Sequence, residues 1–235
     1  MTTTVLRDHQ NADAVAKTAA KDLASRLEQL LQEKPTVHLV VTGGTVGIKT
    51  LEQLGPLIAE MDLSRIQIWW GDERFVQRES ADRNFIQARE ALLSKLTIPQ
   101  ANLHEMPSVE DGNLFVACQE FADSVAVAAP EFDIVLLGMG PDGHVASLFP
   151  NSDAREFGSW IVAEANSPKP PAERISFSFK ALNTADEVWF LVAGADKSAA
   201  VTEVFSGGEL PAALVSGTTL TKWYLDEAAA SGLTS

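Results

Sequence analysis

The stretch FDIVLLGMGPDGHVASLFP, residues 132–150, decides the fold. Its residues 134–137 form a continuous apolar run, which is typical of a strand covered on both faces. Three glycines and a proline then fall within six residues and predict a tight turn, where a ligand can approach the backbone closely. After this turn come His144 and a predicted short helix over residues 145–149, which Pro150 ends. The imidazole is therefore predicted to lie at the carboxyl end of a buried strand, beside a helix amino terminus, where open α/β sheets bind ligands.

The glycines of this turn allow more than one interpretation. Gly138, Gly140 and Gly143 fit the dinucleotide fingerprint G-x-G-x-x-G. That fingerprint should open a long crossover helix near the start of a βαβ unit, but Pro150 follows too soon and the motif lies past the middle of the chain. The alternatives are a catalytic histidine on a rigid turn and a histidine that merely caps or fills the turn. We expect no dinucleotide cofactor, and the neighbouring motifs favour the catalytic histidine.

Strands alternate with helices along the rest of the chain. Such alternation indicates an α/β fold with a mostly parallel, doubly wound sheet and helices on both faces. Ser80 is the predicted amino-terminal cap of one helix. The predicted helices cover residues 11–33, 49–60, 80–96, 114–127 and 223–230, and the predicted strands cover residues 37–41, 65–70, 175–179 and 187–194.

Composition limits the function classes. The 32 acidic and 18 basic residues give a formal net charge of −14, which argues against a nucleic-acid partner, because such a partner needs a basic face. Cys118 is the single cysteine and is predicted to be a core residue, so a reducing compartment is expected. No apolar run has the length of a signal peptide or of a membrane span, and the histidines lack metal-ligand spacing. We expect a cytoplasmic protein without metal, cofactor or membrane partner, as a monomer or weak homodimer.

Five blocks together carry a resemblance to a known family. Besides the histidine turn, they are VVTGGT at 40–45, WWGDERFV at 69–76 with ADRNF at 81–85, SPKPPAERISFSF at 167–179, and VWFLVAGADKSAAV at 188–201. In this order and over most of the chain, the sequence resembles the 6-phosphogluconolactonases. The resemblance implies one domain over residues 1–235, with the Rossmann-like fold of glucosamine-6-phosphate deaminases and ribose-phosphate isomerases.

Two positions distinguish the chain from the deaminases of this fold. Their corresponding segment reads roughly DGHIAFNEP, and its glutamate helps the histidine in ring opening. Phe149 stands at that place here, and Arg74 stands where the deaminases have a tyrosine. Both departures favour a lactonase.

The resemblance also implies a set of binding residues. Arg74 would bind phosphate, which its planar fork suits, with Asp72 and Glu73 predicted to orient it. Lys197 lies at the start of a predicted helix, where the helix dipole disfavours a cation. A lysine in such a place is expected to have an anionic partner, here the phosphate. The small residues after the strand at 37–41 leave backbone N–H groups free for an anion. The predicted substrate- or phosphate-binding residues are Thr42, Gly43, Gly44, Thr45, Asp72, Arg74, Asn84, Gly140, Gly143, Arg174 and Lys197.

The expected chemistry is hydrolysis of 6-phospho-D-glucono-1,5-lactone, the second step of the oxidative pentose phosphate route. A lactone is an activated ester, so one base that deprotonates water suffices, and His144 is suited to that near neutral pH. Asp142 is expected to orient the imidazole and to raise its pKa, and the glycine turn would supply oxyanion donors. Two alternatives stay open: an isomerase or deaminase that uses Asp72 as its carboxylate, and a non-catalytic sugar-phosphate sensor.

Overall fold

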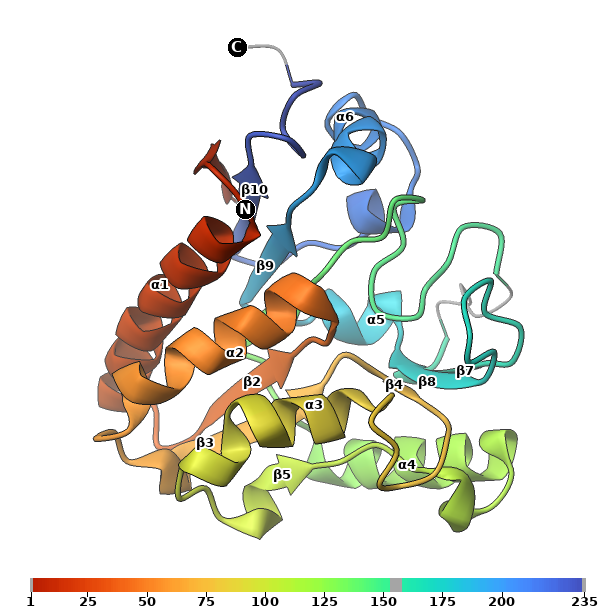
Figure 1. The fold of residues 1–235 in the computed structure, drawn as a ribbon. Helices are drawn as coiled ribbons and strands as arrows, with labels where there is room; N and C mark the ends of the chain where they lie inside the picture. The colour runs from red at the N-terminus through yellow and green to blue at the C-terminus, as the bar shows by residue number, and fades with distance from the viewer. Residues whose placement is uncertain (1, 153–157, 234–235) are drawn as a thin grey trace.

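A seven-stranded parallel sheet forms the centre of the molecule (Figure 1), and the computed structural model describes residues 2–152 and 158–233. The strand order is β1-β10-β9-β6-β2-β3-β5, and every pair in it is parallel. Its strands are β1 (Thr2–His9), β2 (Val37–Val41), β3 (Ile66–Trp70), β5 (Leu103–His104), β6 (Ile134–Leu137), β9 (Glu187–Val192) and β10 (Leu220–Asp226).

Helices cover both faces of this sheet, as the sequence predicted. Strand β6 is buried along its whole length, and its side chains alternate between two apolar cores. Ile134 and Leu136 pack with one group of helices, and Val135 and Leu137 pack with the other. The first group is α1 (Ala12–Glu33), α2 (Gly44–Ile58) and α3 (Asn84–Ala91), and the second is α4 (Leu114–Ala128), α5 (Phe179–Leu182) and α6 (Ser198–Phe205).

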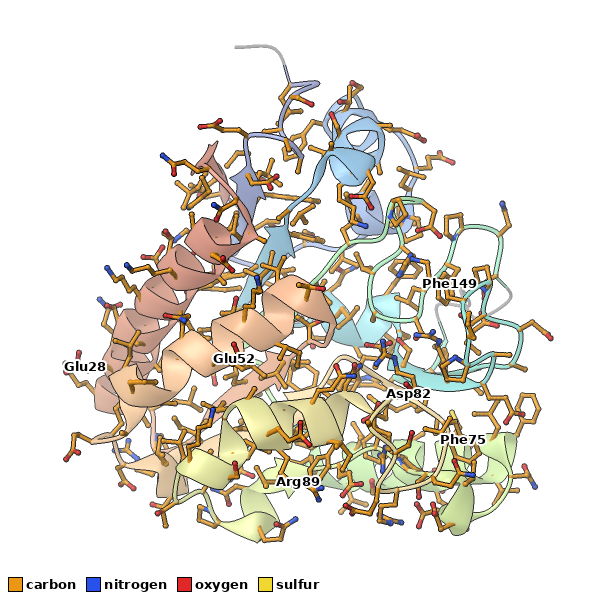
Figure 2. The ribbon with its side chains drawn as sticks, in the orientation of Figure 1. Glu28, Glu52, Phe75, Asp82, Arg89 and Phe149 are labelled. Carbon is orange, nitrogen blue, oxygen red and sulfur yellow. The ribbon has the colours of Figure 1, made fainter. Side chains whose placement is uncertain are left out.

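Helices α1 and α2 of the first group are amphipathic. Leu23 and Leu27 of α1 are fully buried, and Leu54 of α2 is buried against the same core. Figure 2 shows Glu28 of α1 and Glu52 of α2 pointing away from the sheet, and both side chains are exposed. None of the described helices is long and apolar enough to cross a membrane.

A second, antiparallel sheet lies beside the site and was not predicted. It consists of β4 (Asp72–Arg74), β8 (Arg174–Phe177) and β7 (Ile161–Glu164), in the order β4-β8-β7. The strand predicted from the sequence ends at residue 70, but residues 72–74 form a further strand that pairs with β8, and Arg74 faces Arg174 across the pair. This sheet therefore brings two arginines from distant parts of the chain to one place.

Two predicted helices are wrong. Residues 145–149 form no helix, because Ala146 has a left-handed backbone with φ of 48° and Val145 bridges Leu148 instead. Residues 223–230 were predicted as helical, but residues 220–226 form strand β10 between β1 and β9. The alternation of Trp223 and Tyr224 between the two cores explains the strand.

Two further helices begin elsewhere than predicted. The helix predicted from residue 80 begins at Asn84, so Ser80 is not its cap. The helix predicted over 49–60 already begins at Gly44, directly after the turn that follows β2. The predicted helices at 11–33 and 114–127 agree with α1 and α4 within two residues.

Candidate active site

A cavity of about 170 Å³ lies at the carboxyl ends of β2, β3 and β6, and we call it the histidine cavity. Open parallel sheets bind ligands at this edge. Its walls come from the loops after β2 and β6, from β4, from the start of α3 and from the segment before β8. The lining residues are Thr42, Gly43, Gly44, Asp72, Arg74, Asn84, Gly138, Met139, Gly140, His144, Ala146, Lys169 and Arg174.

The glycine turn fixes the imidazole of His144. Its Nδ1 atom lies 2.5 Å from Oδ1 of Asp142, the residue that the sequence predicted to orient it. A Cβ at Gly140 would lie 2.0 Å from the ring, so only glycine leaves room for the imidazole. Among the contacts of the described residues, Nε2 of His144 has no hydrogen-bond partner, and the ring lines the cavity. One ring nitrogen is therefore held while the other remains available.

Burial decides the protonation state of this histidine. Desolvation lowers the pKa of His144 below its ordinary value of 6.5 and outweighs the opposing effects of Asp142 and Asp72. The sequence had suggested a pKa raised by the neighbouring carboxylates, and that expectation is wrong in direction. At neutral pH the imidazole is therefore predominantly uncharged, which is the form that accepts a proton.

Glu73 organises the backbone next to the cavity. Its carboxylate is buried and accepts hydrogen bonds from the backbone N–H groups of Arg74, Asn84 and Phe85, so it holds the first turn of α3 against β4. Burial raises the pKa of Glu73, and Arg83 lies 3.4 Å away as its counter-ion. Glu73 therefore positions the start of a helix and not the guanidinium that it was predicted to orient.

Asp72 and Arg74 also bind other partners than those predicted. The Asp72 carboxylate accepts hydrogen bonds from Nδ2 of Asn84 and from the hydroxyl of Ser147, at 2.6 Å for the latter. Nη1 of Arg74 donates to the carbonyl of Asp82 at 2.6 Å. Two buried polar atoms at the cavity have no partner in the described part of the chain: Nε of Arg74 and Oδ1 of Asn84.

Arg174 shapes the proline-rich loop. Its Nε donates to the carbonyl of Pro171 at 3.2 Å, and its Nη2 donates to the carbonyls of Lys169 and Pro170. The loop in turn brings Lys169 into the cavity wall, where burial lowers the pKa of the ammonium group. Lys169 was not among the predicted site residues, although it lies between two prolines in the motif block at 167–179.

Three predicted binding residues do not line the cavity. Lys197 pairs with its neighbour Asp196 at 2.8 Å. Thr45 lies in the first turn of α2 without reaching the cavity wall. Gly143 serves the backbone, because its φ is +76° and a Cβ there would meet Leu210 at 2.7 Å. The other predicted residues are brought together around the cavity, and Asp142 contacts it through His144.

The amino terminus of α2 adds to the positive character of the site. The helix begins after Gly43, which has no side chain to cap it, so its first backbone N–H groups are open to an anion. A Cβ at Gly43 would lie 1.9 Å from Oδ1 of Asn84, so glycine is required for the close contact of α2 with α3. A chain of net charge −14 thus gathers Arg74, Lys169 and Arg174 beside a helix amino terminus.

Residues 10–223 of the chain match the model of the family described as glucosamine-6-phosphate isomerases/6-phosphogluconolactonase. The chain belongs to this family. The curated protein named 6-phosphogluconolactonase from Mycobacterium leprae is 40% identical, over 91% of this chain and 92% of the relative. The protein of the same name from Streptomyces coelicolor is 38% identical, over 96% and 93%.

Solved structures of the family agree with the fold. The crystal structure of 6-phosphogluconolactonase from Thermotoga maritima has a TM-score of 0.87 and 30% identity, and covers 96% of this chain and 100% of its own. A monomeric glucosamine-6-phosphate deaminase has a TM-score of 0.80 at 19% identity, covering 99% of this chain and 100% of its own, which shows a shared fold alone. The predicted fold type is confirmed.

Other reactive groups of the described residues lie apart from the histidine cavity. Cys118 is buried in α4, and desolvation raises the pKa of its thiol to about 11, so it is a core residue as predicted. Within residues 2–152 and 158–233, no group of three or more His, Cys, Asp or Glu side chains is placed to hold a metal ion.

Proposed function

We propose that the chain hydrolyses 6-phospho-D-glucono-1,5-lactone to 6-phospho-D-gluconate, the second step of the oxidative pentose phosphate pathway. Relatives at 36–40% identity over most of the chain carry the name 6-phosphogluconolactonase. The observation that carries the proposal is the imidazole of His144, held at Nδ1, uncharged near neutral pH and lining the cavity beside three cations.

The geometry supports a simple sequence of proton transfers. Nε2 of His144 takes a proton from water while the water oxygen attacks the lactone carbonyl, and the Asp142 carboxylate stabilises the imidazolium that forms. The backbone N–H groups of Gly138 and Gly140 already donate to the hydroxyl of Thr42 and to the carbonyl of His144. The candidate donor to the oxyanion is therefore the backbone N–H of Met139, which lies between them and lines the cavity. The bond from the carbonyl carbon to the ring oxygen then breaks, and the proton passes from the imidazolium to that oxygen. No covalent enzyme intermediate is needed.

The phosphate group of the substrate would bind at the positive side of the cavity. Arg74 and Lys169 supply charged donors, and the first turn of α2 supplies backbone N–H groups. Lys169 takes the place that the sequence had suggested for Lys197. Arg174 contributes charge at the same wall, although three of its hydrogen bonds go to the loop that carries Lys169.

Assembly and location complete the proposal. We propose a monomer or weak homodimer in the cytoplasm, in line with the single cysteine and the net charge of −14. Size-exclusion chromatography with light scattering tests the assembly: a stable higher oligomer at micromolar concentration would contradict it.

A coupled assay tests the activity. Freshly prepared lactone is mixed with the protein, and 6-phosphogluconate formation is measured above the spontaneous rate. We expect acceleration by the wild-type chain and its loss in His144→Ala. Release of ammonia from glucosamine 6-phosphate would instead support a deaminase, for which Asp72 would be the carboxylate; both its oxygens already accept hydrogen bonds, from Asn84 and Ser147. Binding of 6-phosphogluconate without acceleration would support a sensor.

A further inference from the structure

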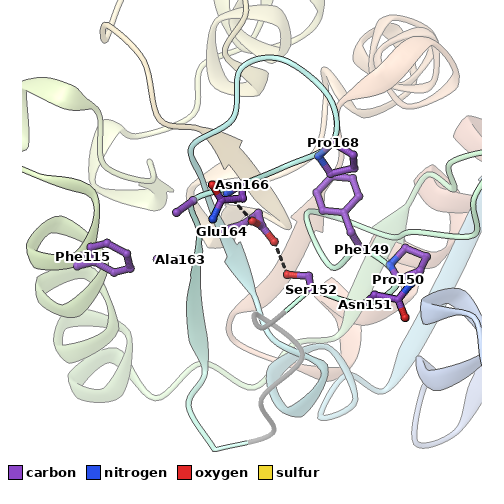
Figure 3. A pocket seen from close by; sticks show the side chains of 10 residues that line it. Phe115, Phe149, Pro150, Asn151, Ser152, Ala163, Glu164, Asn166 and Pro168 are labelled. Carbon is purple, nitrogen blue, oxygen red and sulfur yellow. Dashed lines mark hydrogen bonds between the residues drawn. The ribbon is translucent and has the colours of Figure 1, made fainter.

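Phe149 separates the histidine cavity from a second, larger one. The Phe149 side chain is 2% exposed, and its ring centroid lies 4.6 Å from that of His144, with 37° between the ring planes. The same residue lines a neighbouring cavity of about 430 Å³, which we call the outer cavity. Figure 3 shows the outer cavity, with Pro168 beside the Phe149 ring and Glu164 on the facing strand.

The imidazole of His144 is enclosed on the sides that face the protein. Asp142 occupies the Nδ1 edge, and the backbone of Gly140 lies so close that no Cβ would fit. The Phe149 ring covers a further side of the imidazole. What remains open is the side that lines the histidine cavity.

We propose that Phe149 is a positioning residue for lactone hydrolysis: its ring packs on the His144 imidazole, fixes the direction of Nε2 and keeps water of the outer cavity away from the base. This inference rests on the proposed function, because it assigns His144 the role of the base. It concerns a residue that needs no contact with the substrate.

Water exclusion by Phe149 should lower the pKa of His144, and this effect can be measured. Burial is the largest influence on the pKa of His144 and lowers it, because a desolvated imidazole favours its neutral form. The Phe149 ring contributes to this burial. Of the charged groups around the imidazole, the carboxylates raise the pKa of His144 and Lys169 lowers it. These groups are Asp142 on its own loop, Asp72 and Arg74 on β4, Lys169 on the proline-rich loop and Arg174 on β8. Shortening the ring removes none of these charged groups and admits water, so the pKa of His144 should rise.

Arg174 connects the ring to the cation side of the cavity. Its Cζ atom lies 5.9 Å from the centroid of Phe149, within the range of a cation–π contact. A smaller side chain at position 149 would therefore hold both the His144 imidazole and the Arg174 guanidinium less firmly. We expect kcat to fall by a larger factor than KM rises, because the base loses its fixed direction.

The test uses Phe149→Leu with Phe132→Leu as its matched control. Phe132 is 1% exposed, makes ring contacts and lines another cavity of about 390 Å³, but it precedes β6 at the opposite edge of the sheet. Phe149→Leu should lower kcat at pH 7.5 about tenfold, and should lower the ratio of kcat/KM at pH 5.5 to that at pH 7.5 by about threefold. Phe132→Leu should leave this ratio unchanged.

An NMR titration separates this inference from the proposed function. The chain has four histidines, and the signal of His144 is identified by its loss in His144→Ala. In Phe149→Leu the midpoint of that signal should move to higher pH, whether or not the lactone is the substrate. An active wild type with an unmoved His144 midpoint and an unmoved pH ratio would overturn the role of Phe149. If Phe149→Leu does not fold, Phe149→Met is measured in the same way and decides with the same criterion.

Discussion

His144 and His104 are both partly buried imidazoles whose pKa values lie below 6.5 because burial disfavours their charged forms. Their surroundings differ. His104 stacks on Trp69, with 3.6 Å between ring centroids and 5° between planes, and its Nε2 lies 2.8 Å from Oε1 of Gln67. Nε1 of the same Trp69 donates to Nδ1 of His38. The imidazole of His144 instead has an open nitrogen beside a cavity and a carboxylate on the other nitrogen.

This difference teaches that a shifted pKa does not by itself mark a functional histidine. Burial shifts the pKa values of His104 and His144 in the same direction. The open Nε2, the cavity and the neighbouring cations distinguish the functional candidate. The following predictions test that distinction, beginning with the largest expected effect.

The largest effect is expected on turnover. His144→Ala should lower kcat by about 10²- to 10⁴-fold, the usual contribution of a general base, whereas His104→Gln should leave kcat within about threefold of the wild-type value. Coupled lactone hydrolysis measures both, and circular dichroism establishes that both variants are folded. A folded His144→Ala variant with nearly wild-type kcat would refute the assignment of the base.

Substrate affinity should separate the two lysines in the same way. Lys169 lines the cavity and Lys197 pairs with Asp196, so Lys169→Ala should raise KM by about ten- to a hundredfold and Lys197→Ala by less than about threefold. The unphosphorylated lactone is the control, on which Lys169→Ala should equal the wild type. Equal losses on both lactones would show that Lys169 does not bind the phosphate.

The two lysines also show where sequence reasoning succeeds and where it ends. The buried strand at residues 134–137 and the turn with His144 follow from local patterns, and the order of the motif blocks identifies the family. Lys169 lies in one of these blocks, but its position in the cavity wall does not follow from the local pattern, because it depends on three hydrogen bonds from Arg174 to the loop. Lys197 looked unpaired in the sequence, but its partner is the adjacent residue.

The same limit applies to the elements that were predicted wrongly. Residues 223–230 contain alanines and charges that favour a helix locally, but residues 220–226 pair with both β1 and β9. Long-range pairing of this kind overrides weak helix propensity. The small sheet likewise depends on a long-range pairing, because β4 at residues 72–74 pairs with β8 at residues 174–177, and each segment alone resembles a turn or a short strand.

The pH dependence of activity should reveal the protonation state of His144. Only the neutral imidazole is a base, so kcat/KM should fall about tenfold per pH unit on the acid side of its midpoint. Because burial lowers the pKa of His144, that midpoint should lie below 6.5. At pH 6.5 more than half of the maximal kcat/KM should therefore remain, after correction for spontaneous hydrolysis. A midpoint above 6.5 would mean that the carboxylates Asp142 and Asp72 outweigh burial.

The smallest effect is expected on stability, from His104. Burial lowers its pKa from 6.5 to about 4, so the unfolded chain takes up this proton before the folded chain does as the pH falls. The contribution of neutral His104 is fully present above pH 6.5 and is lost between pH 6.5 and about 4. We expect about 1 kcal/mol, because His104 is only partly buried and solvent screens part of the shift.

His104→Phe keeps a ring on Trp69 but cannot titrate, so it isolates this contribution. Carboxylates titrate equally in both proteins, and the comparison with wild type removes their effect. Between pH 7 and pH 5 the urea midpoint of the wild type should fall further than that of His104→Phe, while the acid limb of kcat/KM should be the same in both. Equal falls in the two midpoints would mean that the charged form of His104 is tolerated in the fold. A shifted acid limb in His104→Phe would mean that the two histidine environments are coupled and that stability and catalysis cannot be assigned to them separately.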